Sequence, residues 1–383
     1  MLLDQQILAS PRFQGRAPDT PGGILAGAFV SARFAEIGLA PDASRAYRLR
    51  SFAITSAGLA ASGTIDAALA ADGSWQRIQL ARLILGETNV SATVERQATG
   101  DLQVTAQGAR LDARAFLAGT AGPAPGAPQL PLPAIELSGR FERVQVTDER
   151  ALEDVTARAT LRNGAWSSLD ANGKLPSGGD VFVAIAEGSG GRDVTVTSTD
   201  AGGFFSAFGL FNGATGGTLE VNAKIEEDPQ GRALAGNVRA RNFHLTRSPA
   251  MIQLLSAASL IGLVEQIQGA GIPFADLEMP FRLNKGGFTL GESRASGASL
   301  GILFEGGLDR DRNQLNLSGT VVPAYMLNNL LGRIPLIGDL IIGEGLLAFT
   351  YRVSGSPQQP VITVNPLSAL APGILGRIFR AGP

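Results

Sequence analysis

Few residues in this chain are of the types that enzymes use for catalysis or metal binding. The chain contains no cysteine and a single histidine, His244. Cysteine and histidine are the commonest ligands of zinc, copper and iron, and histidine is the commonest general base. We therefore expect no metal site and no cofactor. His244 alternates with Phe243 and Leu245 on a predicted strand, which favours a solvent-facing or hydrogen-bonded side chain over a metal ligand.

One catalytic motif does occur, because residues 297–301 read Gly-Ala-Ser-Leu-Gly and match the nucleophile elbow G-x-S-x-G. That elbow needs a strand, a strained turn and a helix, with an acid and a histidine after the serine. Here the only histidine precedes Ser299. The glycine clusters at 188–191 and 213–217 lack the lysine of a phosphate-binding loop, and Glu226-Glu227-Asp228 reads as an acidic turn. We expect a protein that is not an enzyme.

Charge also argues against nucleic acid as a partner. Only 17% of the residues are charged and the net charge is −2, with acidic and basic residues interspersed. A nucleic-acid-binding surface needs clustered basic residues to neutralise phosphates. We therefore expect no nucleic-acid binding.

From about Arg48 onward, apolar residues alternate with small or polar residues, which is the pattern of strands with one buried face. Glycine (49) and proline (21) are frequent, and Asp72-Gly73 and Asn163-Gly164 suit tight hairpin turns. The sequence predicts a mainly β protein of repeated antiparallel hairpins, in which neighbouring strands meander. About 20 strands of 5 to 7 residues, spaced about 4.8 Å apart, would form an array about 90 Å long.

A weak internal repeat is visible when the glycine turns are superposed. The segments ADGSW, RNGAW and NKGGF end at Trp75, Trp166 and Phe288, so each puts an aromatic residue just after a turn. Such a unit suggests a hairpin followed by a return strand. Chance matches in a β-rich chain explain the pattern equally well.

The chain divides into four parts. Residues 1–43 read as a loop plus an amphipathic helix, 44–119 as a first β-repeat region, 120–133 as a Pro/Gly-rich linker, and 134–383 as a second β region. Within this last region we expect one long apolar helix at about 249–268, which Ser248 and Pro249 would start and Gly269 would end, and short C-terminal helices from Asn365-Pro366 onward.

No membrane anchor is expected in this chain. The N-terminus shows no signal peptide. The longest uncharged apolar run, 249–264, is shorter than the ~20 residues that a membrane-spanning helix needs.

Residues 8–42 (LASPRFQGRAPDTPGGILAGAFVSARFAEIGLAPD) resemble the entry segment of M28-type zinc aminopeptidases, in which a Gly-Arg, Pro-Gly loop leads into a helix ending in Gly-Leu. Such peptidases hold two zinc ions with histidine and acidic ligands. With His244 alone this chain lacks that ligand set. We interpret the segment as a fusion remnant, a gene-boundary accident or a coincidence.

Three phrases in the C-terminal third carry a second resemblance: LSGTVVPAYMLNNLLGRIPLIGDL (317–340), GEGLLAFTYRVSG (343–355) and VITVNPLSALAPGILGRIF (361–379). Together they resemble the AsmA-like C-terminal family, the group that includes YhdP- and TamB-type envelope proteins. The segments GGFFSAFGLFNGATGGTLEV and ASLIGLVEQIQGAGIPFADLEMPFRLNKGGFTLGESRASGASLGILFEGGLD extend the likeness to about residues 45–383.

The resemblance implies a protein of the periplasm in bacteria with two membranes, associated with the inner membrane in its full-length family context. Repeated hairpins would form a sheet curled around an apolar groove that binds or conducts phospholipid or another acyl-chain lipid between the inner and outer membranes. The family implies no catalytic residue, and it allows for envelope protein partners.

Candidate groove residues come from three predicted strands of the C-terminal third. They are Ile302, Phe304, Leu315, Leu317, Leu347, Phe349, Tyr351 and Val353. A closed β-sandwich core would also explain these apolar positions. Two other functions stay open at this point: a structural or assembly module of the envelope that acts through protein partners, and a hydrolase inherited from the peptidase-like segment.

Overall fold

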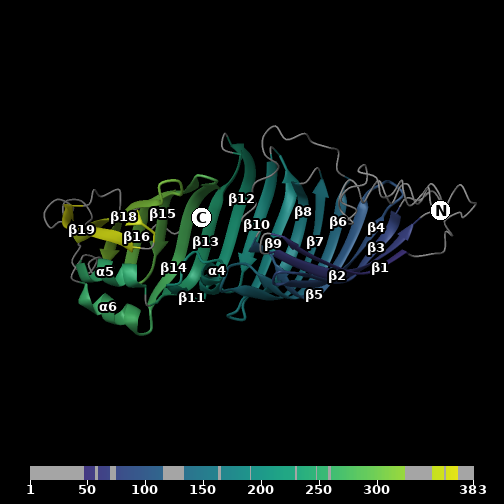
Figure 1. Cartoon of the computed structure of the whole chain (residues 1–383). Helices are drawn as coiled ribbons and strands as arrows, with labels where there is room; N and C mark the ends of the chain where they lie inside the picture. Colours follow the sequence, from purple (N-terminus) through teal and green to yellow (C-terminus); the bar gives the residue numbers. More distant parts are fainter. Residues whose placement is uncertain are drawn as a thin grey trace, which may run out of the picture.

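In a computed structural model, the described part of the chain forms one long, twisted sheet with short helices beside it (Figure 1). It describes residues 47–56, 59–69, 75–114, 133–162, 165–189, 191–228, 231–246, 248–257, 260–323, 347–357 and 359–369. The predicted loop and helix at 1–43, nearly all of the 120–133 linker, and both predicted Asx-Gly turns lie outside the described residues.

The elements are bounded as follows. The strands of the first half are β1 (Tyr47–Ser56), β2 (Leu59–Leu69), β3 (Trp75–Leu85), β4 (Thr88–Arg96), β5 (Leu102–Asp112), β6 (Ile135–Gln145), β7 (Ala151–Arg162), β8 (Ala165–Lys174), β9 (Asp180–Gly188) and β10 (Gly191–Ser198). The second half contains α4 (Ala201–Ala207), β11 (Ala214–Thr215), β12 (Thr218–Asp228), β13 (Gly231–Leu245), α5 (Pro249–Ala257), α6 (Ile261–Gln268), β14 (Ile272–Asn284), β15 (Gly287–Ser296), β16 (Leu300–Asp309), β17 (Gln314–Pro323), β18 (Leu347–Ser356) and β19 (Gln359–Ala369).

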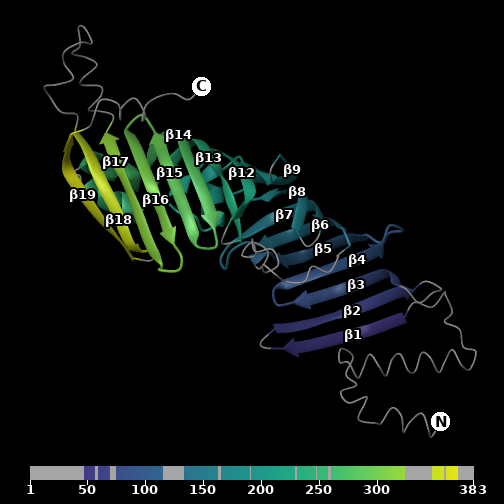
Figure 2. The same ribbon diagram turned by 90° about the horizontal axis from the view of Figure 1, so that it is seen from above.

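The 19 strands of the described residues all belong to one sheet, which confirms the mainly β prediction. Strands that follow one another along the chain pair antiparallel, except that β5 and β6 pair in parallel and short β11 pairs with the end of β13. The two predicted β regions thus meet in the same sheet. With neighbours about 4.8 Å apart, the sheet is roughly 80 Å long. Its twist accumulates from β1 to β19, as Figure 2 shows from above.

The strands are longer than predicted. Apart from β11, they contain 8 to 15 residues, and the longest is β13 (Gly231–Leu245). The prediction of 5 to 7 residues was wrong, because glycines and threonines inside the alternating runs do not end the strands. In β5, for example, Thr105 and Gly108 keep to the alternation, and the strand continues through both.

The predicted repeat aromatics lie at corresponding places in three hairpins. Trp75, Trp166 and Phe288 each stand within the first two residues of the second strand of a hairpin, on β3, β8 and β15. The strands on either side of 163–164 pair through Arg162 and Ala165, as a two-residue turn requires.

The prediction of a single long helix at 249–268 is wrong, because two short helices, α5 and α6, lie in this segment. The start and end are as expected: the Ser248 hydroxyl accepts a hydrogen bond from the amide of Met251, and Gly269 follows α6. An unbroken helix of that length would be about 30 Å long and apolar nearly all round. With the break, Leu255 of α5 and Ile267 of α6 are buried in one cluster with the sheet.

The predicted helix start at Asn365-Pro366 is also wrong, because both residues belong to β19. Proline cannot donate to a sheet hydrogen bond, and β19 pairs only with β18 among the described strands. Pro360 and Pro366 are therefore placed where a strand tolerates proline. Residues 370–383, where the predicted C-terminal helices continue, lie outside the described part of the chain.

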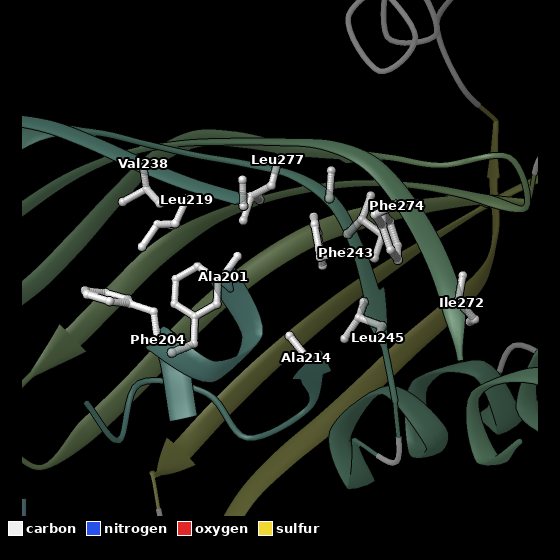
Figure 3. Packing of buried hydrophobic residues seen from close by; sticks show 14 of the residues in the cluster. Ala201, Phe204, Ala214, Leu219, Val238, Phe243, Leu245, Ile272, Phe274 and Leu277 are labelled. Carbon is white, nitrogen blue, oxygen red and sulfur yellow. The ribbon is translucent and has the colours of Figure 1, made fainter. Parts of the chain in front are cut away.

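Buried apolar side chains form two clusters on one side of the sheet. The larger extends from β8 to β19 and takes in all three helices, and the smaller joins β4, β6 and β7. Leu152 and Phe208 pack against both clusters, so the apolar region is continuous. Phe243 and Phe274 stack in the larger one with ring centroids 5.4 Å apart. Figure 3 shows the part of this cluster around α4 and β11–β14.

Candidate functional site

The residues that first suggested chemistry do not form a catalytic arrangement. Residues 297–299 of the G-x-S-x-G motif make the turn between antiparallel β15 and β16, so Ser299 does not stand between a strand and a helix. His244 is exposed on β13, as predicted, and pairs with Thr215 and Pro273. Within the described part of the chain, no three His, Asp or Glu side chains are grouped so as to hold a metal ion.

The most extensive feature of the sheet is that its two faces differ in chemistry over almost all strands. One row of directly paired residues crosses eleven strands from β3 to β14 without a polar side chain. Its members are Leu80, Ala92, Ala106, Gly139, Ala157, Ala171, Val183, Val196, Val221, Val238 and Met279. We call the side of the sheet that carries this row the apolar face.

A second apolar row continues towards the C-terminal end of the sheet. It pairs Leu219, Ala240, Leu277, Ala295, Ile302, Val321 and Phe349 on β12 to β18. Because side chains alternate between faces along a strand, residues in such a row lie side by side on one face.

The opposite side, which we call the polar face, carries a matching row of mostly polar residues. They are Ser91, Gln107, Arg140, Thr156, Asn172, Phe182, Thr197, Glu220, Arg239, Glu278, Arg294, Leu303, Thr320, Thr350 and Asn365. Only Phe182 and Leu303 in this row are apolar.

The sequence-predicted groove residues do come together on the apolar face. Phe304 and Tyr351 lie on either side of Gly319, and Leu317 pairs with Val353. Leu315 lies at the far end of the same face, opposite Gly355. All of these side chains except glycine are half-buried.

Three of the eight predicted residues differ from this picture. Ile302 and Phe349 are only 6% and 7% exposed, so they belong to the core cluster and do not offer an open surface. Leu347 begins β18, but its side chain lies outside the described part of the chain.

Tyr351 combines an apolar setting with a buried polar end. Its ring fills the space above Gly319, where an added Cβ would lie 2.6 Å from the Tyr351 hydroxyl oxygen. That hydroxyl lies 3.5 Å from the Leu303 carbonyl oxygen. Burial raises the pKa of the Tyr351 phenol, so the side chain stays neutral at physiological pH.

The described helices, α4 to α6, contact only part of the apolar face. Helix α4 follows the Asp200 cap and packs its Phe204 towards Leu219 and Val238 (Figure 3). Helices α5 and α6 pack against the C-terminal end of the sheet, where α5 contacts β19 and α6 contacts β14. No helix in the described part of the chain is long and apolar enough to cross a membrane.

On β3–β5 the apolar side chains are less covered. Ile78, Leu80, Val94, Val104 and Ala106 are all half-buried. They are not among the candidate groove residues predicted from the sequence, although β4 and β5 show clear alternation. Alternation alone does not show that the described helices contact mainly β11–β14 and β19.

Ion pairs cross the polar face from strand to strand. Glu278 on β14 accepts a hydrogen bond from the Asn237 amide at 3.0 Å, and its carboxylate lies 3.4 Å from Arg239 and 3.2 Å from Arg294. Burial alone would raise the pKa of Glu278, but Asn237, Arg239 and Arg294 outweigh it and hold this pKa below its usual value.

This lowered pKa predicts an acid-sensitive contribution to stability. A carboxylate with a depressed folded-state pKa stabilises the fold above its ordinary pKa, here 4.5, and the contribution is lost as the pH falls through the folded-state pKa. As the pH is lowered from neutral to about 3, the urea concentration at the unfolding midpoint should fall less steeply for Glu278→Gln than for the unchanged protein. Glu142→Gln, at an exposed position of β6, is the control. Equal slopes in all three proteins would contradict the prediction.

Comparison of the chain with protein-family models, with curated proteins and with solved structures finds no match.

Proposed function

We propose that this chain is a non-enzymatic lipid-binding protein whose apolar face holds the acyl chains of phospholipid or a similar lipid. The observation that carries the proposal is the unbroken apolar row from Leu80 to Met279, backed by a polar row on the other face. A sheet that only needed a core would not need a continuous apolar row that includes side chains left half-buried, such as Leu80 on β3.

The chemistry of this face suits hydrocarbon. Acyl chains are bound by removing apolar surface from water, which is worth about 0.8 kcal/mol for each buried CH₂ group and requires no directional partner. The row offers no charged or hydrogen-bonding side chain that would select one position along it. Lipid could therefore occupy successive positions along the face.

Two regions of the apolar face suit an acyl chain best. One is β3–β5, where Leu80 and Ala106 are half-buried. The other is the end of the face formed by Leu315, Leu317 and Val353, away from the buried Ile302 and Phe349. Between them, α4 covers Leu219 and Val238, so we propose that lipid binds at the two ends of the face and passes the centre only if α4 moves.

The cellular setting of the proposal rests on the resemblance of the three C-terminal phrases to AsmA-like envelope proteins. By that resemblance the chain would act in the periplasm, associated with the inner membrane in its full-length family context, and would carry lipid between the inner and outer membranes. Envelope protein partners would be compatible with this role.

Photo-crosslinking tests the proposal strand by strand. A photoreactive residue would be placed at Leu80 or Leu317 on the apolar face, with the adjacent Gln79 or Asn316 as its matched control. After irradiation in a bacterial host, mass spectrometry should find phospholipid attached at Leu80 and Leu317 and little at either control. Equal labelling at both faces, or no lipid at any position, would contradict lipid binding. Protein adducts at these positions without lipid would favour an assembly module.

A further inference from the structure

The polar face contains a hollow that the lipid function does not use. It has a volume of about 580 Å³ and lies over β7–β10, β12 and β13. This size falls within the range of about 300–1,000 Å³ that is typical of small-molecule sites. We call it the central hollow.

The floor of the central hollow includes Phe182, one of the two apolar residues in the polar row. This side chain is 37% exposed, although a phenylalanine gains most by being buried. On β9 it stands directly between Asn172 of β8 and Thr197 of β10. Directly paired residues have Cβ atoms about 5 Å apart, so an aromatic ring is flanked closely by an amide and a hydroxyl.

Further hydroxyl groups border this ring. Thr199 and Thr218 line the hollow and are exposed, as are Asn172 and Thr197. The Asn172 carbonyl oxygen accepts a hydrogen bond from the Thr156 hydroxyl at 2.6 Å, which fixes the amide with its NH₂ group on the side away from Thr156. A ligand over Phe182 would therefore meet both donors and acceptors.

The charges around the hollow balance. Its lining includes three acidic residues, Asp154, Asp180 and Glu220, and three basic residues, Lys174, Arg239 and Arg241. Lys174 pairs with Asp180 at 2.9 Å, and Arg239 pairs with Glu278 at 3.4 Å. A site for phosphate or another strong anion would carry an excess of basic groups, so the balance favours a neutral ligand.

We propose that the central hollow binds a neutral saccharide. One face of a sugar ring would lie over Phe182, because a pyranose presents C–H groups on its flat side and hydroxyl groups at its edge. The ring hydroxyls would then reach Asn172, Thr197 and Thr218. This combination of an exposed aromatic ring and a border of hydroxyls and amides accounts for an apolar side chain between Asn172 and Thr197.

A second hollow offers an internal control. It lies over β15–β19, has a volume of about 910 Å³, and is lined by Leu303, the other apolar member of the polar row, by Thr320 and Asn365, and also by Phe304 and Tyr351 of the apolar face. Leucine has no flat ring against which a sugar could pack. Leu303→Ala therefore removes an apolar side chain from the polar face without changing the proposed site.

Titration with neutral tetrasaccharides of glucose and of N-acetylglucosamine tests the proposal, by calorimetry and by saturation-transfer NMR. At least one should bind, with Phe182→Ala weakening affinity about tenfold and Phe182→Tyr and Leu303→Ala leaving it nearly unchanged. Because Phe182 lies on the opposite face from the lipid surface, lipid crosslinking at Leu80 should be unaffected in Phe182→Ala.

The proposal is overturned if no tetrasaccharide binds at millimolar concentration, if Phe182→Ala binds as well as the unchanged protein, or if only phosphorylated or sulfated sugars bind. If the protein bound a saccharide but showed no lipid crosslinks at Leu80 or Leu317, the proposed lipid function would be refuted and the saccharide site would stand.

Discussion

Ala106→Asp should remove most of the lipid that co-purifies with the protein. Ala106 lies in the apolar row between Ala92 and Gly139, and its side chain is half-buried. A carboxylate there would lose water whenever an acyl chain covered it. Desolvating a polar group without a partner costs about 1–3 kcal/mol by mutational measures, and more for a charge. We expect lipid recovered in native mass spectrometry to fall about tenfold or more.

Gln107→Asp is the matched control, because it places the same group one residue further along β5 on the polar face. Gln107 is exposed and pairs with Ser91 and Arg140. This variant should retain lipid at the level of the unchanged protein. Both variants should keep the β-type circular dichroism spectrum, since neither position is fully buried. If Ala106→Asp kept its spectrum and its lipid, the apolar face on β4–β6 would not be the binding surface.

Phe274→Ala should cause a large loss of stability. Phe274 on β14 is 1% exposed and stacks on Phe243 of β13, and it lies in the larger core cluster (Figure 3). Truncating a buried phenylalanine removes transfer free energy and leaves a cavity, which together cost about 3–5 kcal/mol. The urea midpoint should fall accordingly.

Phe182→Ala makes the same chemical change at an exposed position and is expected to shift the midpoint little. An array of strands need not unfold in one step, so amide hydrogen exchange on β13 and β14 should be measured alongside the urea transition. Faster exchange confined to those strands and their neighbours would match the prediction. A midpoint equal to that of Phe182→Ala, with unchanged exchange, would show that Phe274 is not part of a tightly packed core.

Local pattern was enough to predict the kind of fold. The alternation in β5, from Leu102 to Gly108, specifies a strand with two different faces whatever surrounds it. The same pattern brought Phe304, Tyr351 and Val353 to one face, because pairing with β17 places them in adjacent rows. The hairpin around 163–164 followed from turn chemistry.

The helices were harder to predict. The 249–268 segment has a good start and a good end, and nothing in its composition marks the break before Leu260. The break depends on where the sheet offers apolar surface to Leu255 and Ile267. The strand assignment of Asn365-Pro366 depends in the same way on the partner strand β18, which overrides the local preference for a helix start.

The sequence by itself determined that the chain forms a β sheet with one apolar and one polar face, and that it is poor in the residues of metal and acid–base chemistry. Alternation acts between neighbouring residues, so it can be read along the chain. Only the tertiary structure decided which part of the apolar face is covered: Ile302 and Phe349 became core, while Leu80 and Ala106 stayed half-buried. It also placed Phe182 in the central hollow. Which part of the apolar face is covered, and where the polar face is hollowed, depend on strands and helices that are far apart in sequence. No local pattern encodes either.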